Sequence, residues 1–276
     1  MYSTGMSIRL CVLGSSSSGN CTFVSTGKTA VLIDAGFSAK MTLARLEAIG
    51  VDPASVKAIC LSHEHLDHTR GVSVLHRRHH IPVYANRGTA EGLRATMEEA
   101  RDVECQVFST GTDFSIGDLT IHPFTVPHDA YEPVGFVIRH GEHRVAVVTD
   151  LGMPTTLIRE QLRTCCAIVL EANHDLDLLR ASTRPWSLKQ RILGRQGHLS
   201  NRHTAELLSE IASPGLRQVF LAHLSAECNQ LDLALRETRA ALSDPAHQHI
   251  RIGPTFPDRP GEVWDSDLLP ANGISP

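Results

Sequence analysis

Residues 63–68 read HEHLDH and place three imidazoles and two carboxylates on one short loop. The loop follows residues 56–62, an apolar run typical of a buried strand. A stiff strand that ends in clustered nitrogen and oxygen donors holds them ready for a metal ion. His63 and His65 point the same way, because side chains alternate along extended backbone, and Asp67 and His68 can serve a second ion. The spacing therefore predicts a two-metal site, and a chance cluster of surface histidines is the alternative.

The composition is that of an ordinary globular protein. No apolar run reaches the ~18 residues of a membrane-spanning helix, and the N-terminus has no secretory pattern. Seven cysteines without paired spacing indicate free thiols in a reducing cytoplasm. The net charge of −4 predicts no overall basic surface. Basic residues do gather at 70–80 and 184–195, where phosphate contact and a solvated helix face are equal alternatives. We expect a cytoplasmic protein with no membrane partner.

Strand and helix patterns alternate through the chain, which is typical of an α/β fold with mixed sheets. We expect two β-rich halves packed face to face with helices outside. The predicted strands lie at residues 8–13, 22–25, 30–34, 56–62, 82–84, 103–108, 119–122, 134–139, 144–150, 167–171, 218–223 and 249–252. The predicted helices lie at 39–49, 71–79, 89–100, 154–163, 201–211 and 229–242, with Asn201 and Asn229 as N-caps. One domain is expected over residues 8–243, followed by a Pro/Gly-rich tail, 244–276, that wraps the surface or is partly disordered.

Five of the predicted apolar strands end in a charged or metal-binding residue. Ligands gather beyond the carboxyl ends of strands in α/β sheets, and a buried charge there must be paired or bound to metal. Helix capping or solvent exposure explains any one of these ends, but poorly explains all of them together. The sequence therefore predicts one polar rim, formed by Asp34, His63, Asp150, Glu171 and His223.

The rim and the loop together supply two sets of metal ligands. Pro127 stiffens a turn that presents His128 as a further ligand. Asp34 is expected behind the ligands, where it would hydrogen-bond one imidazole and fix its tautomer. Imidazole and carboxylate without thiolate suit zinc, manganese or iron. We expect one ion on His63, His65 and His128, a second on Asp67, His68 and His223, and Asp150 between them.

These residues, in this order, resemble the five motifs of the metallo-β-lactamase superfamily over residues 8–240. The resemblance implies an αβ/βα four-layer sandwich, a dinuclear site at one edge and hydrolase activity, but it does not decide the substrate. Segments outside the metal motifs look like the small bacterial exonuclease-like branch related to ribonuclease J and ribonuclease Z. That branch is associated with 5′-to-3′ DNA exonuclease activity. Only 72 residues separate Asp150 from His223, which leaves no room for the large domain that ribonuclease J inserts. Cys228 departs from the polar residue or histidine expected there.

Two loops are candidates for contact with a phosphate of the substrate. The first contains Ser16, Ser18 and Asn20, whose hydroxyls and backbone N–H groups suit an anion, and a plain turn is the alternative. The second places Ser200 and Asn201 at the start of a helix, where simple capping is the alternative.

Three further residues are candidates for catalysis or for support of the site. Asp67 is expected to orient the attacking water and accept its proton. His198 is expected to stabilise a phosphate oxygen or protonate the leaving oxygen. His174, like Glu171, either supports the site or closes a turn.

The sequence leaves three classes of function open. The first is a phosphodiesterase that acts on nucleic acid, with DNA favoured over RNA. The second is a hydrolase of a small cyclic phosphodiester, thioester or lactone, which the negative net charge favours. The third is a non-enzymatic metal-binding module, which a set of seven ligands disfavours because structural zinc needs four. A homodimer that supplies the missing clamp is also open.

Overall fold

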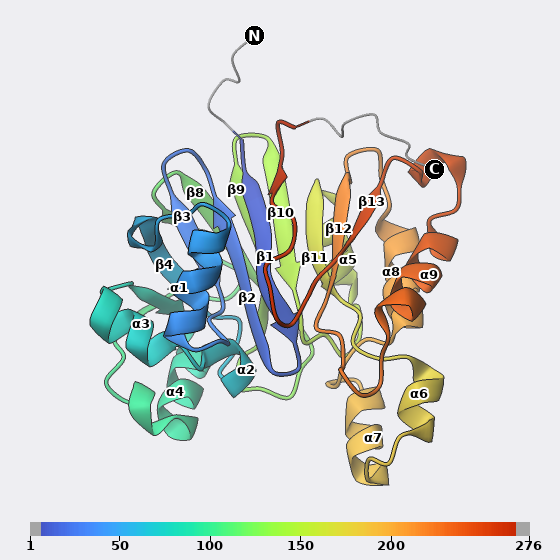
Figure 1. The fold of residues 1–276 in the computed structure, drawn as a ribbon, viewed down its shortest axis with the longest axis horizontal. Helices are drawn as coiled ribbons and strands as arrows, with labels where there is room; N and C mark the ends of the chain where they lie inside the picture. Colours follow the sequence, from blue (N-terminus) through green and yellow to red (C-terminus); the bar gives the residue numbers. More distant parts are fainter. Residues whose placement is uncertain (1–6, 269–276) are drawn as a thin grey trace.

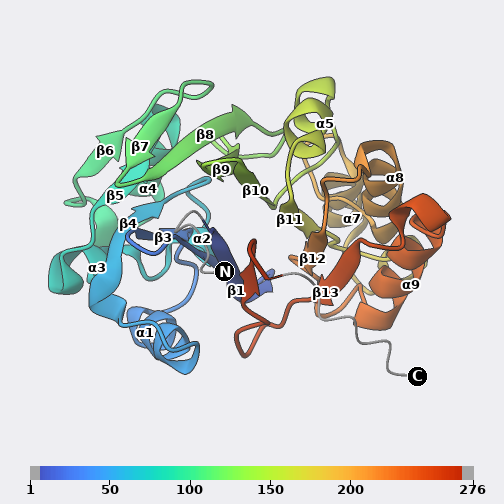
Figure 2. The ribbon, with the colours of Figure 1, turned by 90° about the horizontal axis from the view of Figure 1, so that it is seen from above.

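The structure, a computed structural model, describes residues 7–268. Two seven-stranded sheets face each other, and helices cover their outer faces (Figures 1 and 2). The first sheet is antiparallel from β14 to β3 and parallel from β3 to β6. In spatial order its strands are β14 (Trp264–Asp265), β1 (Arg9–Ser16), β2 (Gly19–Ser25), β3 (Ala30–Ile33), β4 (Val56–Cys60), β5 (Val83–Ala85) and β6 (Cys105–Val107).

The second sheet has the same plan. It is parallel from β13 to β10 and antiparallel from β10 to β7. In spatial order its strands are β13 (Arg251–Pro254), β12 (Gln218–Ala222), β11 (Ala167–Glu171), β10 (His143–Val148), β9 (Val134–His140), β8 (Leu119–Thr125) and β7 (Phe114–Ile116). The predicted α/β four-layer sandwich is confirmed.

The helices fall into two groups, one on each side of the paired sheets (Figure 2). The first group is α1 (Ala39–Ala48), α2 (Leu66–Thr69), α3 (Val72–His79) and α4 (Arg87–Thr96). The second is α5 (Thr156–Arg163), α6 (Leu176–Ala181), α7 (Trp186–Leu193), α8 (Asn201–Ile211) and α9 (Leu231–Ala241). Single 3₁₀ turns occur at η1 (Pro53–Ser55), η2 (Glu98–Ala100) and η3 (Pro245–His247). None of the helices within residues 7–268 is long and apolar enough to cross a bilayer.

The core explains why the strands are apolar on both faces. Along β1, Leu10 and Val12 point between the two sheets, while Cys11 and Leu13 point to the helical layer outside. Phe136 and Val145 of the second sheet fill the layer between the sheets from the other side. Strands buried on both faces need continuous apolar runs, which is the pattern seen in the sequence.

The structure corrects several predicted element boundaries. The N-cap of α8 is Ser200 and that of α9 is Gln230, so Asn201 and Asn229 are not N-caps. Asn229 instead donates to the carbonyl of Ala172 at 2.7 Å and pairs with the Asn201 amide. The short strands β7 and β14 and the helices α6 and α7 were not predicted. Among them, α6 and α7 extend beyond the sheets at the end where α2 lies (Figure 1).

The segment predicted as a tail contributes to both sheets within the described residues. β13 pairs with β12 of the second sheet, and β14 pairs with β1 of the first. Between them, the backbone N–H of Gly261 donates to Val12. Residues 244–268 therefore contribute one edge strand to each sheet, and residues 269–276 lie outside the described part of the chain.

Candidate metal centre

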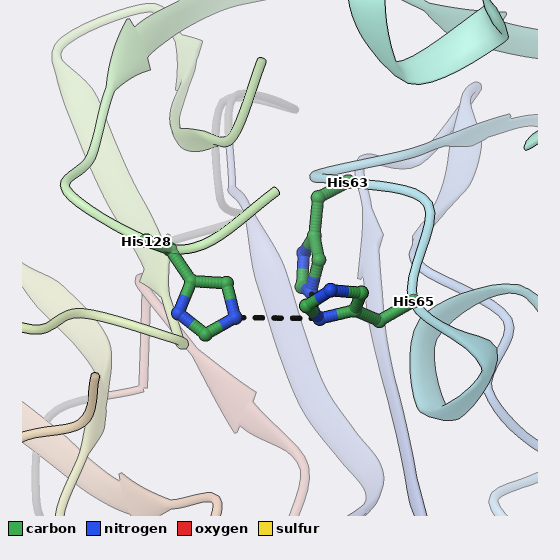
Figure 3. Close-up of side chains that lie close together, drawn as sticks. All are labelled: His63, His65 and His128. Carbon is green, nitrogen blue, oxygen red and sulfur yellow. Dashed lines mark hydrogen bonds between the residues drawn. The ribbon is translucent and has the colours of Figure 1, made fainter. Parts of the chain in front are cut away.

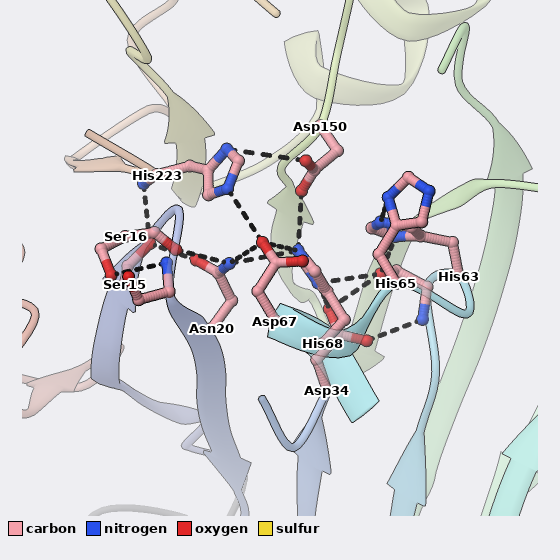
Figure 4. A network of polar contacts seen from close by, with 12 residues as sticks. Ser15, Ser16, Asn20, Asp34, His63, His65, Asp67, His68, Asp150 and His223 are labelled. Atoms are coloured by element: carbon pink, nitrogen blue, oxygen red, sulfur yellow. Dashed lines mark hydrogen bonds and ion pairs between the residues drawn. The ribbon is translucent and has the colours of Figure 1, made fainter. Parts of the chain in front are cut away.

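The five predicted strand ends meet at one edge of the sandwich. Asp34 and His63 follow strands of the first sheet, and Asp150, Glu171 and His223 follow or end strands of the second. Asp34, Asp150 and His223 have left-handed backbone, with φ of 63°, 56° and 57°. This conformation costs about 1–2 kcal/mol for a residue with a Cβ, and the surrounding packing must offset that cost. The strained turns aim all three side chains at the same place (Figure 4).

The first candidate ion site consists of three histidines, shown in Figure 3. The Nδ1 atom of His65 lies 3.1 Å from Nε2 of His63 and 3.3 Å from Nε2 of His128. Their other nitrogens are held by the protein: Nδ1 of His63 lies 2.9 Å from the Ser62 hydroxyl, and Nδ1 of His128 lies 3.2 Å from the Gly197 carbonyl. Burial lowers the pKa of His63 well below its usual value and also lowers the pKa of His128. Three converging imidazoles fit a divalent cation.

The second candidate ion site lies beside the first. Oδ2 of Asp67 lies 3.6 Å from Nε2 of His68 and 3.4 Å from Nε2 of His223. Asp150 reaches both sites, because its Oδ2 lies 2.9 Å from Nε2 of His68 and its Oδ1 lies 3.6 Å from Nε2 of His128. The structure thus brings together all seven predicted ligands, in two groups with Asp150 between them. Figure 4 shows six of them, and Figure 3 shows His128.

Two buried carboxylates orient the imidazoles from behind. Asp34 accepts at 2.8 Å from both the Ser62 N–H and the Ser62 hydroxyl, and its Oδ2 lies 2.8 Å from Nδ1 of His68. Burial lowers the pKa of His68, but the carboxylates of Asp150 and Asp34 outweigh this and hold it well above its usual value. A carboxylate behind a ligating histidine fixes the tautomer and makes the ring more basic.

Glu171 has the same position behind His223. Its Oε1 lies 2.7 Å from Nδ1 of His223 and 2.8 Å from Nδ1 of His198, while Oε2 accepts from two backbone N–H groups. Burial raises its pKa, but the two histidines lower it to about 2. Glu171, Asp150, His198 and His223 could also surround an ion. The backbone bonds to Glu171 favour a positioning role instead.

Five of the seven ligands line a cleft of about 200 Å³, namely His65, Asp67, His128, Asp150 and His223, and His198 lies in its wall. With Nδ1 of His198 directed at Glu171, Nε2 is left for a ligand in the cleft. Asn20 lies behind the cleft: its amide nitrogen is 3.5 Å from Oδ2 of Asp67 and 3.1 Å from Nε2 of His68. Ser16 and Ser18 line a neighbouring pocket.

Four other residues singled out in the sequence lie away from the ligand cluster. Ser200 and Asn201 are buried, and their side chains bond the His203 N–H and Asn229. The structure therefore does not bring this pair to the cleft. His174 is 1% exposed and its ring nitrogens have no hydrogen-bond partner in the described chain. Cys228 lies in a small apolar cluster beneath α6 and α7.

The cleft also contains residues that the sequence did not single out as site residues. Asn173 donates to the His223 carbonyl at 2.9 Å and lines the cleft. Arg184 and Arg191, from the segment of α6 and α7, also line the cleft, where Arg184 pairs with Glu227 and Arg191 pairs with Asp129. The only signal for the arginines was the basic run at 184–195, which is equally typical of an exposed helix.

Asp34→Asn should weaken ion binding without unfolding the protein. Asparagine keeps the shape and tolerates the left-handed backbone, but it lacks the charge that supports His68. Loss of such a partner lowers metal affinity about 10- to 100-fold. Competition with a chelator measures the affinity, and Asp52→Asn, at an exposed turn, is the matched control. Equal ion retention in Asp34→Asn and in the control would show that Asp34 does not support ion binding through His68.

Comparison with known proteins identifies the family of this chain. A family model described as a beta-lactamase superfamily domain matches residues 29–224. The chain belongs to the metallo-β-lactamase superfamily. It is 32% identical over 262 residues to Exodeoxyribonuclease YycJ of Bacillus anthracis, which covers 95% of this chain and 96% of that protein. It is 34% identical over 225 residues to Exodeoxyribonuclease WalJ of Streptococcus pneumoniae, which covers 81% of this chain and 84% of the other.

Among solved structures, the metallo-β-lactamase fold protein YhfI of Bacillus subtilis is similar, with a TM-score of 0.70 and 18% identity. That match covers 94% of this chain and 99% of YhfI, so the fold is shared over nearly the whole length. Membership of this superfamily makes the protein a metal-dependent hydrolase, and the resemblance stated from its motifs is confirmed.

Proposed function

We propose that the protein is a dinuclear phosphodiesterase that degrades DNA from the 5′ end. The observation that carries the proposal is the cleft, in which two groups of metal ligands face a wall with two arginines. The names of the relatives YycJ and WalJ support a DNA substrate. The seven free thiols suit a reducing compartment, so we assign the enzyme to the cytoplasm.

The proposed ions are zinc or manganese, with iron as the third choice. One would be held by His63, His65 and His128, and the other by Asp67, His68 and His223, with Asp150 shared. Bound divalent ions would supply Lewis acidity, which polarises the phosphate and favours ionisation of the attacking water.

Asp67 is proposed as the acceptor of the water's proton. Its side chain is 23% exposed and lines the cleft, whereas the other carboxylates at the centre are almost fully buried. Burial raises the pKa of Asp67, but His68 and His223 outweigh this effect and lower the pKa below its usual value. The carboxylate is therefore ionised and has an oxygen that can accept a proton from water.

His198 is proposed as the donor to the phosphate or to the leaving oxygen. Burial lowers its pKa, but Glu171 outweighs this and raises it, so the ring holds a proton more readily than a free histidine. With Nδ1 bonded to Glu171, the Nε2 proton is the one available to the substrate.

The charge distribution supports a polyanionic substrate despite the net charge of the chain. Residues 176–197 contain one acidic and five basic residues, a net charge of +4, while the whole chain carries −4. Arg184 and Arg191 of this segment line the cleft and pair with Glu227 and Asp129, and a net positive charge remains when these two partners are counted. A local cluster of basic residues attracts a phosphate backbone even when the net charge of the whole protein is negative. We also propose that the protein forms a homodimer, in which the second subunit provides further contacts to the nucleic acid.

The product pattern from end-labelled single- and double-stranded DNA and RNA, with manganese and with zinc, tests the proposal. We expect mononucleotides to be released progressively from the 5′ end of DNA. Turnover of a chromogenic phosphodiester without release of nucleotides would favour the small-substrate hydrolase. One tightly held ion per chain and no turnover would favour the metal-binding module.

A further inference from the structure

A second pocket adjoins the metal centre and has no role in the chemistry described so far. Its volume is about 460 Å³, within the range of about 300–1,000 Å³ usual for pockets that bind small molecules. Its apolar surface comes from Phe37, Met41, Leu224 and Phe256. We call it the serine-loop pocket, because Ser16 and Ser18 of the β1–β2 turn form part of its rim.

The serine-loop pocket and the metal cleft share two walls. Ser17 lines the cleft, while Ser16 and Ser18 on either side of it line the pocket. His223 lines the cleft, and Leu224, the next residue, lines the pocket. The hydroxyl of Ser15 accepts from the His223 N–H at 2.7 Å and fixes these walls together (Figure 4). A substrate strand that runs from the ion sites across the β1–β2 turn would enter the serine-loop pocket.

The serine-loop pocket also has a free positive charge. Arg70 lines it, is exposed, and has no ion pair or side-chain hydrogen bond among residues 7–268. In contrast, Arg45 on the neighbouring helix α1 donates to the carbonyls of Leu13 and Pro257. An unpaired guanidinium next to an apolar, hydroxyl-lined cavity suits a ligand with a flat apolar part and an anionic part.

We propose that the serine-loop pocket binds the nucleoside next to the scissile phosphate of a single DNA strand, and that Arg70 pairs with the next phosphate along. This deepens the proposed function and rests on it. The base would lie on the apolar side chains, as bases do on nonspecific single-strand sites, while the serine hydroxyls face the sugar or the base edge. The pocket would hold the strand so that the scissile phosphate lies at the ion sites, without the large domain that ribonuclease J inserts.

A charge-deletion cycle tests the contact between Arg70 and the phosphate. The substrate is a short single-stranded oligodeoxynucleotide in which one phosphate on either side of the scissile bond is replaced by an uncharged methylphosphonate. In the wild type, we expect one of these replacements to raise KM about 10-fold. In Arg70→Ala, the KM for the normal oligonucleotide should already be raised about 10-fold, and the same replacement should add little.

Three comparisons separate this role from a structural one. The slope of log KM against log salt should become shallower in Arg70→Ala, by the amount expected for the loss of about one phosphate contact. Arg70→Lys should restore part of the slope. Ala226→Trp, which fills the pocket from an exposed position, should also raise KM. Arg78→Ala, an exposed arginine outside both cavities, should behave as the wild type.

The proposal is overturned if the methylphosphonate effect is the same in Arg70→Ala as in the wild type. It is also overturned if Arg70→Ala loses kcat/KM equally for the oligonucleotide and for a chromogenic phosphodiester, since that indicates a structural effect. A wild type that releases no nucleotides from DNA would instead contradict the proposed function itself, before any variant is compared.

Discussion

Asp150→Asn is expected to lower the rate of phosphodiester hydrolysis by at least about 10³-fold while the protein stays folded. Asp150 is within reach of both groups of ligands, with Oδ2 2.9 Å from His68 and Oδ1 3.6 Å from His128. Asparagine retains the size of the side chain and tolerates the φ of 56° at this turn. The change therefore removes the charge with little effect on the backbone.

The measurements are the initial rate, the number of bound ions and the thermal unfolding midpoint. Asp113→Asn is the control, because this carboxylate is partly exposed, lies on the far sheet edge, and pairs with His122 and Arg139 away from the centre. We expect fewer than two ions per chain in Asp150→Asn and two in the control. A variant with the wild-type rate would show that Asp150 does not join the two sites.

Gly36→Ala is expected to reduce the free energy of unfolding by about 3 kcal/mol and to disturb ion binding. A Cβ at Gly36 would lie 1.7 Å from the Asp67 carbonyl oxygen and 2.6 Å from the Asn20 backbone nitrogen. Both obstacles are backbone, so no side chain can move aside. The turn after β3 would have to separate from α2, which carries Asp67 and His68.

Gly27→Ala provides the matched control for this prediction. A Cβ at Gly27 would meet nothing within 4 Å, so its stability should stay within about 0.5 kcal/mol of the wild type. Urea unfolding measures both changes, and chelator competition measures the ions. If Gly36→Ala were as stable as Gly27→Ala, the close approach of the two loops would not be needed for the fold.

The cluster of candidate metal ligands was predictable because it depends on residue types that have few other uses in such positions. Clustered histidines behind an apolar strand, and strands that end in Asp34, Asp150 and His223, could be read directly from the order of residues. The helices α6 and α7 were not predictable in the same way. Each is short, and much of their apolar surface packs within the small cluster of Leu179, Ile192 and Cys228, so no long periodic pattern marks them.

The substrate contacts were harder to predict than the metal ligands, because a polar side chain can hydrogen-bond to the protein as well as to a ligand. Ser200 and Asn201 have the chemistry of a phosphate site, but Ser200 caps α8 and Asn201 bonds Asn229 in the interior. Asn20 holds Asp67 and His68 rather than lining the cleft. Which partner a serine or asparagine takes depends on neighbours that are far away in the sequence.

The sequence by itself determined the α/β sandwich, the superfamily and the types of donor at the centre, because apolar periodicity and ligand identity are properties of local residues. The tertiary structure alone decided which imidazole nitrogen points into each candidate ion site and which carboxylate lies behind the ring. It also decided that Arg184, Arg191 and Arg70 lie around the centre. These features depend on left-handed turns and on contacts between residues up to about two hundred positions apart, such as His223 with Ser15. No local pattern encodes such contacts, because they exist only once both sheets have closed on each other.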